Sequence, residues 1–269
     1  MRIAVIVTTY NRPDALAAVM EGFLAQSDPD FELIVADDGS TGATRERIGQ
    51  FAARSPFPVT HVWQEDAGFR AAAIRNKAIA STSAEYLVFT DGDCIPSRHF
   101  VASHRKLAEP GHFLSGNRVL LSPDFTAKVL EERLPVHHWP MKKWLSAWRE
   151  GDINRLLPLI SLPDLMRKRT PEKWKGVKTC NLSAWKRDVV AVNGFDEGYT
   201  GWGLEDSDFV IRLLHSGVRH KSARFSAPVF HLWHEENDRS RLSENDRMLE
   251  ALLASDKIRA LEGLDLHRP

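Results

Sequence analysis

Three stretches in the first third of the chain are almost entirely apolar and rich in β-branched side chains. They are Arg2–Thr9, Phe31–Ala36 and Tyr86–Thr90. Continuous apolar runs of this length are typical of strands that are buried on both faces of a sheet. Pro13 opens a segment in which apolar side chains recur at the spacing of a helix, at Leu16, Val19, Met20, Phe23 and Leu24.

Similar patterns predict further helices over Thr44–Arg54 and Ala71–Ala80 and a short strand at Val59–Trp63. Strands that alternate with helices indicate a parallel α/β sheet. Ligands of such sheets bind beyond the carboxyl ends of the strands. The polar residues that directly follow the apolar runs are therefore the first candidates for a functional site.

The pattern changes after residue 122. Residues 124–176 hold Trp139, Trp144, Trp148 and Trp174 and four prolines from Pro135 to Pro163, so we expect short helices and loops that cover one end of the sheet. Regular structure is then expected as helices at Lys186–Val192 and Leu204–His215, a strand pair at Val218–Ser222 and Pro228–Trp233, and a terminal helix at Ser243–Leu261.

The 269 residues carry 36 basic and 36 acidic side chains, so the formal net charge is zero. Proteins that grip nucleic acid by its phosphates usually have a basic domain, so we expect no nucleic-acid partner. No apolar run approaches the roughly 20 residues of a membrane-spanning helix. The two cysteines, Cys94 and Cys180, suit a reducing cytosol. We expect a cytoplasmic protein that either is soluble or touches the inner face of the plasma membrane peripherally.

Acidic clusters follow two of the predicted strands. Asp91-Gly92-Asp93 places two carboxylates two residues apart, around a glycine that lets another group approach the backbone. Hard oxygen ligands at this spacing suit a divalent ion that holds a diphosphate. Asp37-Asp38-Gly39-Ser40 has a similar position. The alternative for both clusters is an ordinary strand-terminal turn, in which Asp and Gly are common.

Two further groups lie in the last third of the chain. Glu205, Asp206 and Asp208 stand at a helix start, where backbone N–H groups favour negative charge, and Trp202 precedes them between two glycines. The tryptophan suits either stacking on a sugar or plugging the core. His231 and His234 lie three apart near a strand end, where they either bind a metal of the Mn²⁺ type or have a structural role.

In this order, these residues resemble the family 2 glycosyltransferases of the GT-A fold. Val7–Arg12 and the two strand-end acidic clusters carry the N-terminal match. Gly68-Phe69-Arg70 with Ile74-Arg75-Asn76 is similar to a segment of bacterial chondroitin-polymerase-type enzymes, and the block from Asn193 to His234 is similar to the C-terminal domain of β-1,4-galactosyltransferases. The resemblance covers roughly residues 2–122 and 177–237.

The resemblance implies one GT-A domain, an α/β fold with a mixed, mostly parallel sheet flanked by helices. Residues 1–122 would form its nucleotide-sugar-binding half and residues 177–240 its acceptor and catalytic half. Residues 123–176 would be a helical and loop insertion that faces the acceptor or a membrane. Residues 241–269 would form a C-terminal helix.

The resemblance also implies a nucleotide-sugar donor, most often UDP-linked, and a role for each matching residue. The donor-binding residues would be Thr8, Tyr10, Arg12, Asp38, Arg75, Asp91 and Gly92, with Asp38 accepting the uracil N3–H. Asp93 and His234 would bind the divalent metal, Mn²⁺ in preference to Mg²⁺, and His231 would be a further ligand where the galactosyltransferases have methionine. Asp206 would be the catalytic base, Glu205 would bind hydroxyls, and Trp202 with Gly203 would contact the sugar.

The implied reaction is an inverting, metal-dependent transfer to a hydroxyl of a glycan or glycolipid acceptor, in bacterial surface polysaccharide or lipopolysaccharide synthesis. A sugar hydroxyl is a poor nucleophile and needs a carboxylate base, and the departing diphosphate needs a cation. A nucleotidyltransferase acting on a sugar phosphate is one alternative, although Thr8–Pro13 lacks the glycine-rich loop usual there. A non-catalytic sugar-nucleotide-binding module is the other.

The insertion also offers a candidate membrane contact. Between Leu165 and Lys178 six basic residues stand against one acid, Glu172. Together with the nearby tryptophans, this composition suits contact between residues 139–178 and an anionic membrane or a phosphorylated glycolipid. The alternative is a solvated basic face over a loop that tryptophans hold in place.

Overall fold

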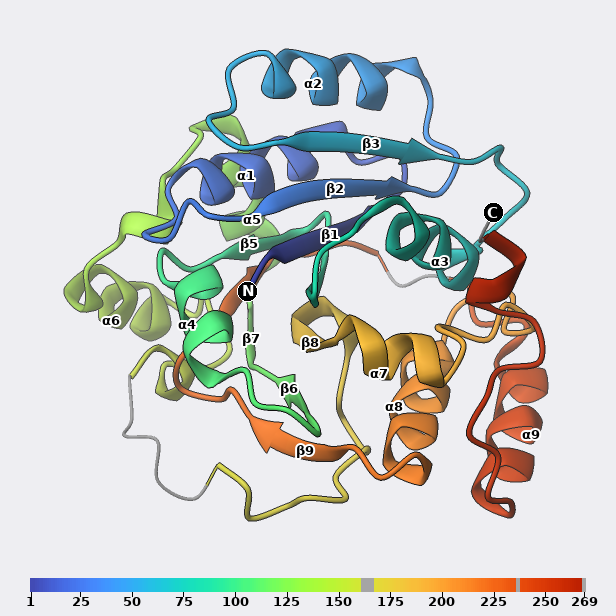
Figure 1. Cartoon of the computed structure of the whole chain (residues 1–269). Coiled ribbons are helices and arrows are strands. Elements are labelled where there is room, and N and C mark those ends of the chain that lie inside the picture. Colours follow the sequence, from blue (N-terminus) through green and yellow to red (C-terminus); the bar gives the residue numbers. More distant parts are fainter. Residues whose placement is uncertain (161–166, 236–237, 268–269) are drawn as a thin grey trace.

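A seven-stranded sheet forms the centre of the molecule in the computed structural model, which describes residues 1–160, 167–235 and 238–267 (Figure 1). Its strands are β1 (Ile3–Thr9), β2 (Glu32–Asp37), β3 (Val59–Trp63), β4 (Tyr86–Asp91), β6 (His112–Ser115), β8 (Leu182–Trp185) and β9 (Arg219–Ser222). They lie in the order β3-β2-β1-β4-β8-β6-β9. The first four are parallel, as the alternating pattern predicts, β8 is antiparallel to both neighbours, and β6 and β9 are parallel.

Helices cover both faces of this sheet (Figure 1). They are α1 (Pro13–Leu24), α2 (Gly42–Ala52), α3 (Ala71–Ser81), α4 (Phe100–Leu107), α5 (Pro123–Glu131), α6 (Met141–Glu150), α7 (Lys186–Ala191), α8 (Glu205–His215) and α9 (Leu242–Leu253), with 3₁₀ turns η1 (Val136–His138), η2 (Leu157–Leu159), η3 (Thr179–Asn181) and η4 (Leu264–His267). Alternate residues of β1 face two separate cores: Val5 packs with side chains of α1, α2 and α4, and Ile6 with side chains of α3, α7 and α8. The apolar runs are therefore strands buried on both faces.

A second sheet of three short strands lies beside the first. It consists of β5 (Cys94–Pro96), β10 (Val229–His231) and β7 (Arg118–Leu120), in that order. The two strands expected near residues 218–222 and 228–233 exist, but the prediction that they pair with each other is wrong. β9 pairs with β6 in the main sheet, whereas β10 lies between β5 and β7. Strands of three or four residues carry too little pattern to indicate their partners.

The predicted terminal helix is also too long. α9 ends at Leu253, and the chain then returns to the turn that follows α7, where the backbone N–H groups of Ala260 and Leu264 donate to the carbonyls of Val192 and Asn193. Leu261, predicted as the last helical residue, is 82% exposed. These bonds to a distant segment outcompete continuation of the helix, and sequence periodicity does not reveal them.

The described residues between 123 and 176 form short helices and loops, as expected. Trp144 of α6 is buried and stacks on Phe230 of β10, with ring centroids 4.4 Å apart and planes 15° apart. This stacking fixes α6 against the second sheet. In the part of the chain that the structure describes, no helix has both the length and the apolar character needed to cross a bilayer.

A chain of buried, neutral hydrogen bonds joins the main sheet to α4. His104 is fully buried, and its Nδ1 lies 2.8 Å from the Ser183 hydroxyl while its Nε2 lies 3.2 Å from Asn181 Oδ1. Ser183 in turn bonds the Tyr86 hydroxyl at 2.8 Å. Because Asn181 Oδ1 only accepts, Nε2 carries the proton and Nδ1 accepts from Ser183. A second proton on the ring would break this chain, and burial lowers the pKa of His104 to about 4.

This depressed pKa predicts a specific pH dependence of stability. The folded state keeps His104 neutral down to about pH 4, whereas in the unfolded chain the histidine takes up a proton near pH 6.5. The contribution of His104 to the free energy of unfolding is therefore lost as the pH falls between these two values. Relative to wild type, His104→Gln should therefore become less destabilising by about 1.4 kcal/mol per pH unit over that window. Urea unfolding between pH 7.5 and pH 4.5 measures this difference.

Val101→Ala is the matched control, because Val101 is equally buried on the same helix and does not titrate. Its destabilisation should not change with pH. A His104→Gln difference that is also independent of pH would contradict the neutral hydrogen-bond chain.

Candidate functional site

The loops after β1 and β2 are tied together at the carboxyl edge of the sheet. Asn11, which adopts φ 47°, accepts from the backbone N–H of Thr41 at 2.9 Å, and its own N–H donates to Ser40 Oγ at 2.8 Å. Asp37 is not available for ligands, because it accepts from the Ser40 N–H at 2.8 Å and contacts His61 Nε2 at 2.9 Å. Asp37, the first residue of the Asp37–Ser40 cluster, therefore stabilises the turn after β2.

Asp38 points into this edge and is held by two neighbours. Its carboxylate accepts from the Arg70 N–H at 2.7 Å and from Gln64 Nε2 at 2.5 Å. Burial raises the pKa of Asp38, and these two hydrogen bonds act in the opposite direction. Gln64 carried no sequence signal for this role, and Arg70 belongs to the Gly68-Phe69-Arg70 segment noted above, which did not indicate a bond from its backbone to Asp38.

Tyr10 and Arg12 lie on the loop between β1 and α1. Tyr10 is 49% exposed, and its hydroxyl donates to Asp66 Oδ2 at 2.9 Å. Arg12 Nε lies 3.7 Å from Asp14 Oδ1. Both side chains are at the rim of the site, where solvent or a ligand can reach them.

Arg75 stands at the centre of the candidate site with three carboxylates around it. Its Nη1 lies 3.0 Å from Glu205 Oε1 and 3.6 Å from Asp206 Oδ1, and its Nη2 lies 3.5 Å from Asp91 Oδ1. Its Nε donates to Thr8 Oγ1 at 3.2 Å. The side chain is only 5% exposed. The carboxylates raise the pKa of Arg75 although burial opposes them, so the guanidinium is a permanent positive charge inside the cluster.

The carboxylates around Arg75 respond to burial and to one another. Burial, followed by the charge of Asp206, raises the pKa of Glu205, and Arg75 opposes both effects. Burial also raises the pKa of Asp91, and Arg75 again lowers it. Arg75 therefore offsets part of the effect that burial has on the pKa values of Glu205 and Asp91. Arg75 thus holds the acidic cluster together, a role that its prediction as a donor-binding residue did not indicate.

Asp206 is oriented by a residue that sequence reasoning missed. Thr179 Oγ1, on η3, donates to Asp206 Oδ1 at 2.7 Å. No described residue donates a hydrogen bond to the other oxygen, Oδ2, and the side chain is 11% exposed. Thr179 belongs to no motif, so only the fold places it beside Asp206.

The turn before α8 aims these acids into the site. Gly201 and Gly203 have φ values of 72° and 109°, and Leu204 has φ 75°. This left-handed backbone reverses the chain directly before the helix N-terminus, whose N–H groups favour Glu205 and Asp206. Asp208 points elsewhere and bonds Arg212 Nε at 2.6 Å in the interior.

Trp202 is half-buried and does not plug the core. The Arg239 guanidinium lies 5.0 Å from the centroid of its ring. The Gly203 carbonyl accepts from Asn245 Nδ2 at 2.9 Å, which ties the turn to α9. The interpretation of Trp202 as a plug of the core is therefore wrong, and sugar stacking stays a prediction.

The pairing of β5 with β10 brings a carboxylate and two imidazoles together. Cys94 lies opposite His231 in the ladder, and the Leu232 N–H donates to the Asp93 carbonyl at 2.8 Å. Asp93 Oδ1 lies 3.7 Å from His231 Nε2, and its Oδ2 lies 3.4 Å from His234 Nε2. The three ligand atoms lie within 4.8 Å of one another.

This donor set fits a divalent transition metal. His234 Nδ1 donates to the Glu235 carbonyl at 2.6 Å, which leaves the Nε2 lone pair free for a metal. Burial lowers the pKa of His231, which favours the neutral ring that a metal ion requires. One carboxylate with two imidazoles suits Mn²⁺ or a similar ion better than Ca²⁺. Asp93 thus faces the histidines while Asp91 faces Arg75.

Gly92 separates these two carboxylates. Its N–H donates to the Thr8 carbonyl at 2.7 Å, and a Cβ at this position would lie 2.8 Å from Thr9 Oγ1. Any larger residue would push β4 away from β1 at the edge where the site forms. Glycine here permits the close approach of the two strand ends.

Comparison with known proteins gives two matching families. Residues 4–158 match glycosyl transferase family 2, and residues 165–235 match a family described as the N-terminal domain of galactosyltransferase. The validoxylamine A glucosyltransferase of Streptomyces hygroscopicus subsp. limoneus is 31% identical over 226 residues, which cover 80% of this chain and 48% of the relative. Chondroitin synthase of Escherichia coli is 25% identical over 251 residues, which cover 85% of this chain and 34% of the synthase. The chain thus spans about half the length of these relatives or less.

Solved structures share the fold. The mannosyltransferase PcManGT of Pyrobaculum calidifontis, in complex with GDP-Man and Mn²⁺, has a TM-score of 0.64 at 17% identity and covers 94% of this chain and 64% of its own. S. aureus TarS 1-349, in complex with UDP-GlcNAc, has a TM-score of 0.62 at 15% identity, and the match covers 99% of this chain and 69% of the TarS chain. The predicted GT-A fold is confirmed, and a glycosyltransferase is favoured over a nucleotidyltransferase. Because the first match spans more than half of the sequence, this chain belongs to glycosyl transferase family 2.

Proposed function

We propose that this glycosyltransferase moves a sugar from a nucleotide donor, UDP-linked in the first instance, to a hydroxyl of a glycan or lipid-linked glycan, with inversion at the anomeric carbon. The observation that carries the proposal is the arrangement around Asp91 and Asp93. One carboxylate faces a metal-binding donor set, and the other faces Arg75 beside Asp206. Donor and base would therefore meet at one edge of the sheet.

Asp206 is the group best placed to act as the base. Its Oδ1 is occupied by Thr179 and approached by Arg75, whereas Oδ2 has no hydrogen-bond donor among the described residues. As the acceptor oxygen bonds to the anomeric carbon, its proton passes to Oδ2, and the bond between that carbon and the diphosphate oxygen breaks. Attack from the face opposite the leaving group inverts the configuration. Arg75 and Thr179 hold the Asp206 carboxylate in its orientation before attack.

The other residues would hold the substrates. Asp93, His231 and His234 would bind a divalent cation, which stabilises the charge that develops on the departing diphosphate. Thr8, Tyr10, Arg12 and Asp38 border the space beyond β1 and β2, where a nucleotide would lie. For Asp38 to accept a uracil N3–H, its carboxylate would have to share an oxygen with Gln64 or Arg70. Trp202, on the turn before α8, would stack on a sugar ring.

A donor panel tests the proposal directly. Purified protein is incubated with UDP-, GDP- and other nucleotide sugars in Mn²⁺, Mg²⁺ or EDTA without an acceptor, and released nucleotide is measured. We expect slow hydrolysis of one UDP-sugar that EDTA abolishes. Release of nucleotide from a GDP-sugar would change only the proposed identity of the nucleotide. No release from any donor, together with no nucleotide binding by calorimetry, would overturn the proposal.

We also propose that α6 and the segment after it contact an anionic membrane surface, where a lipid-linked acceptor would be found. Met141 and Trp148 lie on one face of α6 and are 43% and 48% exposed, and Leu157 and Ile160 are 59% and 41% exposed. Lys142 and Lys143 lie on the same helix. Apolar side chains beside lysines suit an interfacial site.

The basic stretch from residue 165 supports this proposal less than expected. Residues 165 and 166, like Pro163, lie outside the described part of the chain. Arg167 is buried, where its guanidinium donates to the carbonyls of Ser222 and Arg224, each at 2.9 Å. Lys168 is paired with Glu109. Two of the six basic residues therefore hold the fold together.

Flotation with phosphatidylglycerol-containing vesicles measures the contact. At low salt, wild type should float with the vesicles, and Trp148→Ala should float several-fold less, because burial of a tryptophan side chain in the interface is lost. Leu253→Ala is the control, since Leu253 is similarly exposed, at 46%, on α9. Equal flotation of both variants, or none for wild type, would contradict the proposed surface.

A further inference from the structure

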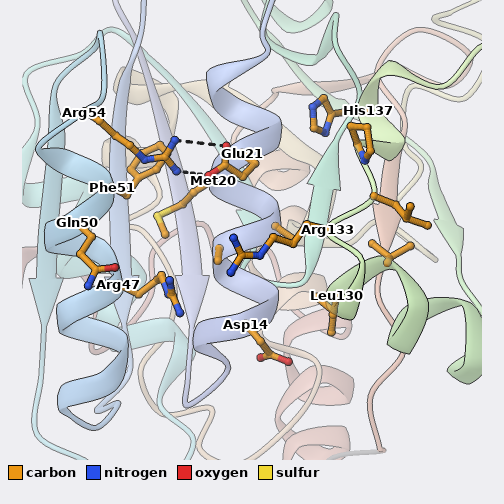
Figure 2. Close-up of a pocket in the computed structure, with 15 residues that line it drawn as sticks. Asp14, Met20, Glu21, Arg47, Gln50, Phe51, Arg54, Leu130, Arg133 and His137 are labelled. Atoms are coloured by element: carbon orange, nitrogen blue, oxygen red, sulfur yellow. Dashed lines mark hydrogen bonds and ion pairs between the residues drawn. The ribbon is translucent and has the colours of Figure 1, made fainter.

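A groove runs along the outer face of α1, and none of its lining residues belongs to the site described above (Figure 2). Ala17 and Ala18 of α1 form its floor, Arg47 and Phe51 of α2 lie on one wall, and Leu130 and Arg133 lie on the other, in α5 and directly after it. Its volume is about 650 Å³. This volume is that of a pocket for a small molecule, and two small alanines keep the floor open.

Two arginines in this groove have no acidic partner among the residues that the structure describes. Arg54 at one end is paired with Glu21, and Asp14 at the other end lies 3.7 Å from Arg12. Arg47 and Arg133 form no ion pair or hydrogen bond with any described residue, and their side chains point into the space between α2 and α5 (Figure 2). Burial lowers the pKa of His137, which also lines the groove, to about 4, so this ring adds no charge at neutral pH.

The backbone at Arg133 gives an independent indication. Arg133 has φ 52°, and the Leu134 N–H beyond it donates to the Val129 carbonyl at 3.0 Å. This is the C-terminal turn of a helix in which glycine usually takes the left-handed position. Arg133 thus places a long cationic side chain at a position where glycine would be less strained, and that side chain projects into the groove. Backbone strain of this kind is often retained for a function.

We propose that the groove binds a phosphate-bearing amphiphile. The phosphate would lie between the guanidinium groups of Arg47 and Arg133, each of which can donate two parallel hydrogen bonds to phosphate oxygens. The apolar part would lie over Ala17, Ala18 and Leu130. The phosphate could belong to a lipid headgroup or to a free phosphate compound, and the recognising chemistry is the same for both.

Isothermal titration calorimetry in EDTA tests this site on the intact chain. The probes are dihexanoyl phosphatidic acid below its micelle concentration, dihexanoyl phosphatidylcholine as the zwitterionic match, and inorganic phosphate. The variants are Arg47→Gln and Arg133→Gly, with Arg247→Gln on α9 as the control for loss of one positive charge. Arg133→Gly should fold at least as stably as wild type, because it relieves the left-handed backbone, so lost binding would not reflect unfolding.

We expect wild type to bind the phosphatidic acid, with each groove variant at least about tenfold weaker, as for loss of a charge-assisted hydrogen bond. Weak binding of inorganic phosphate beside tight binding of phosphatidic acid would identify a lipid source. Equal affinity for inorganic phosphate and phosphatidic acid would show that the apolar part contributes nothing and would contradict binding of an amphiphile. No binding of either phosphate probe, equal affinity for phosphatidylcholine, or affinities unchanged in Arg47→Gln and Arg133→Gly would overturn the proposal.

Discussion

Asp206→Asn should lower the rate of sugar transfer by about 10²- to 10⁴-fold while the donor still binds. An amide keeps the size of the carboxylate and the hydrogen bond from Thr179 to Oδ1, but it cannot take the proton of the acceptor hydroxyl. General-base catalysis by a positioned side chain typically contributes a factor of this size. Steady-state transfer rates, with donor affinity measured separately by calorimetry, give the two quantities.

The matched control is Asp246→Asn, which removes an exposed carboxylate from α9. Its transfer rate should equal that of wild type. An Asp206→Asn enzyme with full transfer activity would refute the base assignment. Thr179→Val should give a smaller loss than Asp206→Asn, because Thr179 orients the base and does not itself take the proton. If both variants lost activity equally together with donor binding, a structural role for the pair would be the better explanation.

Substitution of the proposed metal ligands should abolish metal binding and transfer together. Asp93→Asn removes the only negative ligand atom of the described donor set, and His234→Ala removes an imidazole that already presents its Nε2. Loss of an outer-shell partner typically costs 10- to 100-fold in metal affinity, so loss of a direct ligand should cost at least about 100-fold. Titration of Mn²⁺ followed by electron paramagnetic resonance measures the affinity without any sugar donor.

Asp256→Asn, at an exposed position after α9, serves as the control for loss of a carboxylate. EDTA should suppress transfer by wild type, and added Mn²⁺ should restore it. Unchanged Mn²⁺ affinity in both ligand variants would place the metal elsewhere. Full activity in EDTA would remove the metal from the proposed mechanism.

Arg75 explains how the site can hold several acids close together. Three carboxylates lie within 3.6 Å of its guanidinium, and its side chain is almost completely buried. An ammonium could not contact three carboxylates and a threonine hydroxyl in one plane, whereas the guanidinium presents five N–H groups in a fixed fork. For this reason Arg75→Lys is not a conservative change here.

Much of the N-terminal half was predictable from the sequence. The apolar runs that became β1, β2 and β4 are buried on both faces, so their patterns are continuous and strong. The acidic clusters had to lie at the same edge, because parallel strands end together. The short strands β5, β7 and β10 gave no such pattern, yet they bring Asp93 to His231 and His234.

The sequence by itself determined the α/β alternation, the family, and which residues are proposed to bind metal and move protons. Local patterns suffice for these, because buried strands need continuous apolar runs and the motifs are contiguous. Only the tertiary structure decided that Asp91 faces Arg75 while Asp93 faces the histidines, that Thr179 holds Asp206, and that Arg167 is buried. Each of these contacts joins segments far apart in the chain, and their geometry depends on strand register and on packing that no local pattern encodes.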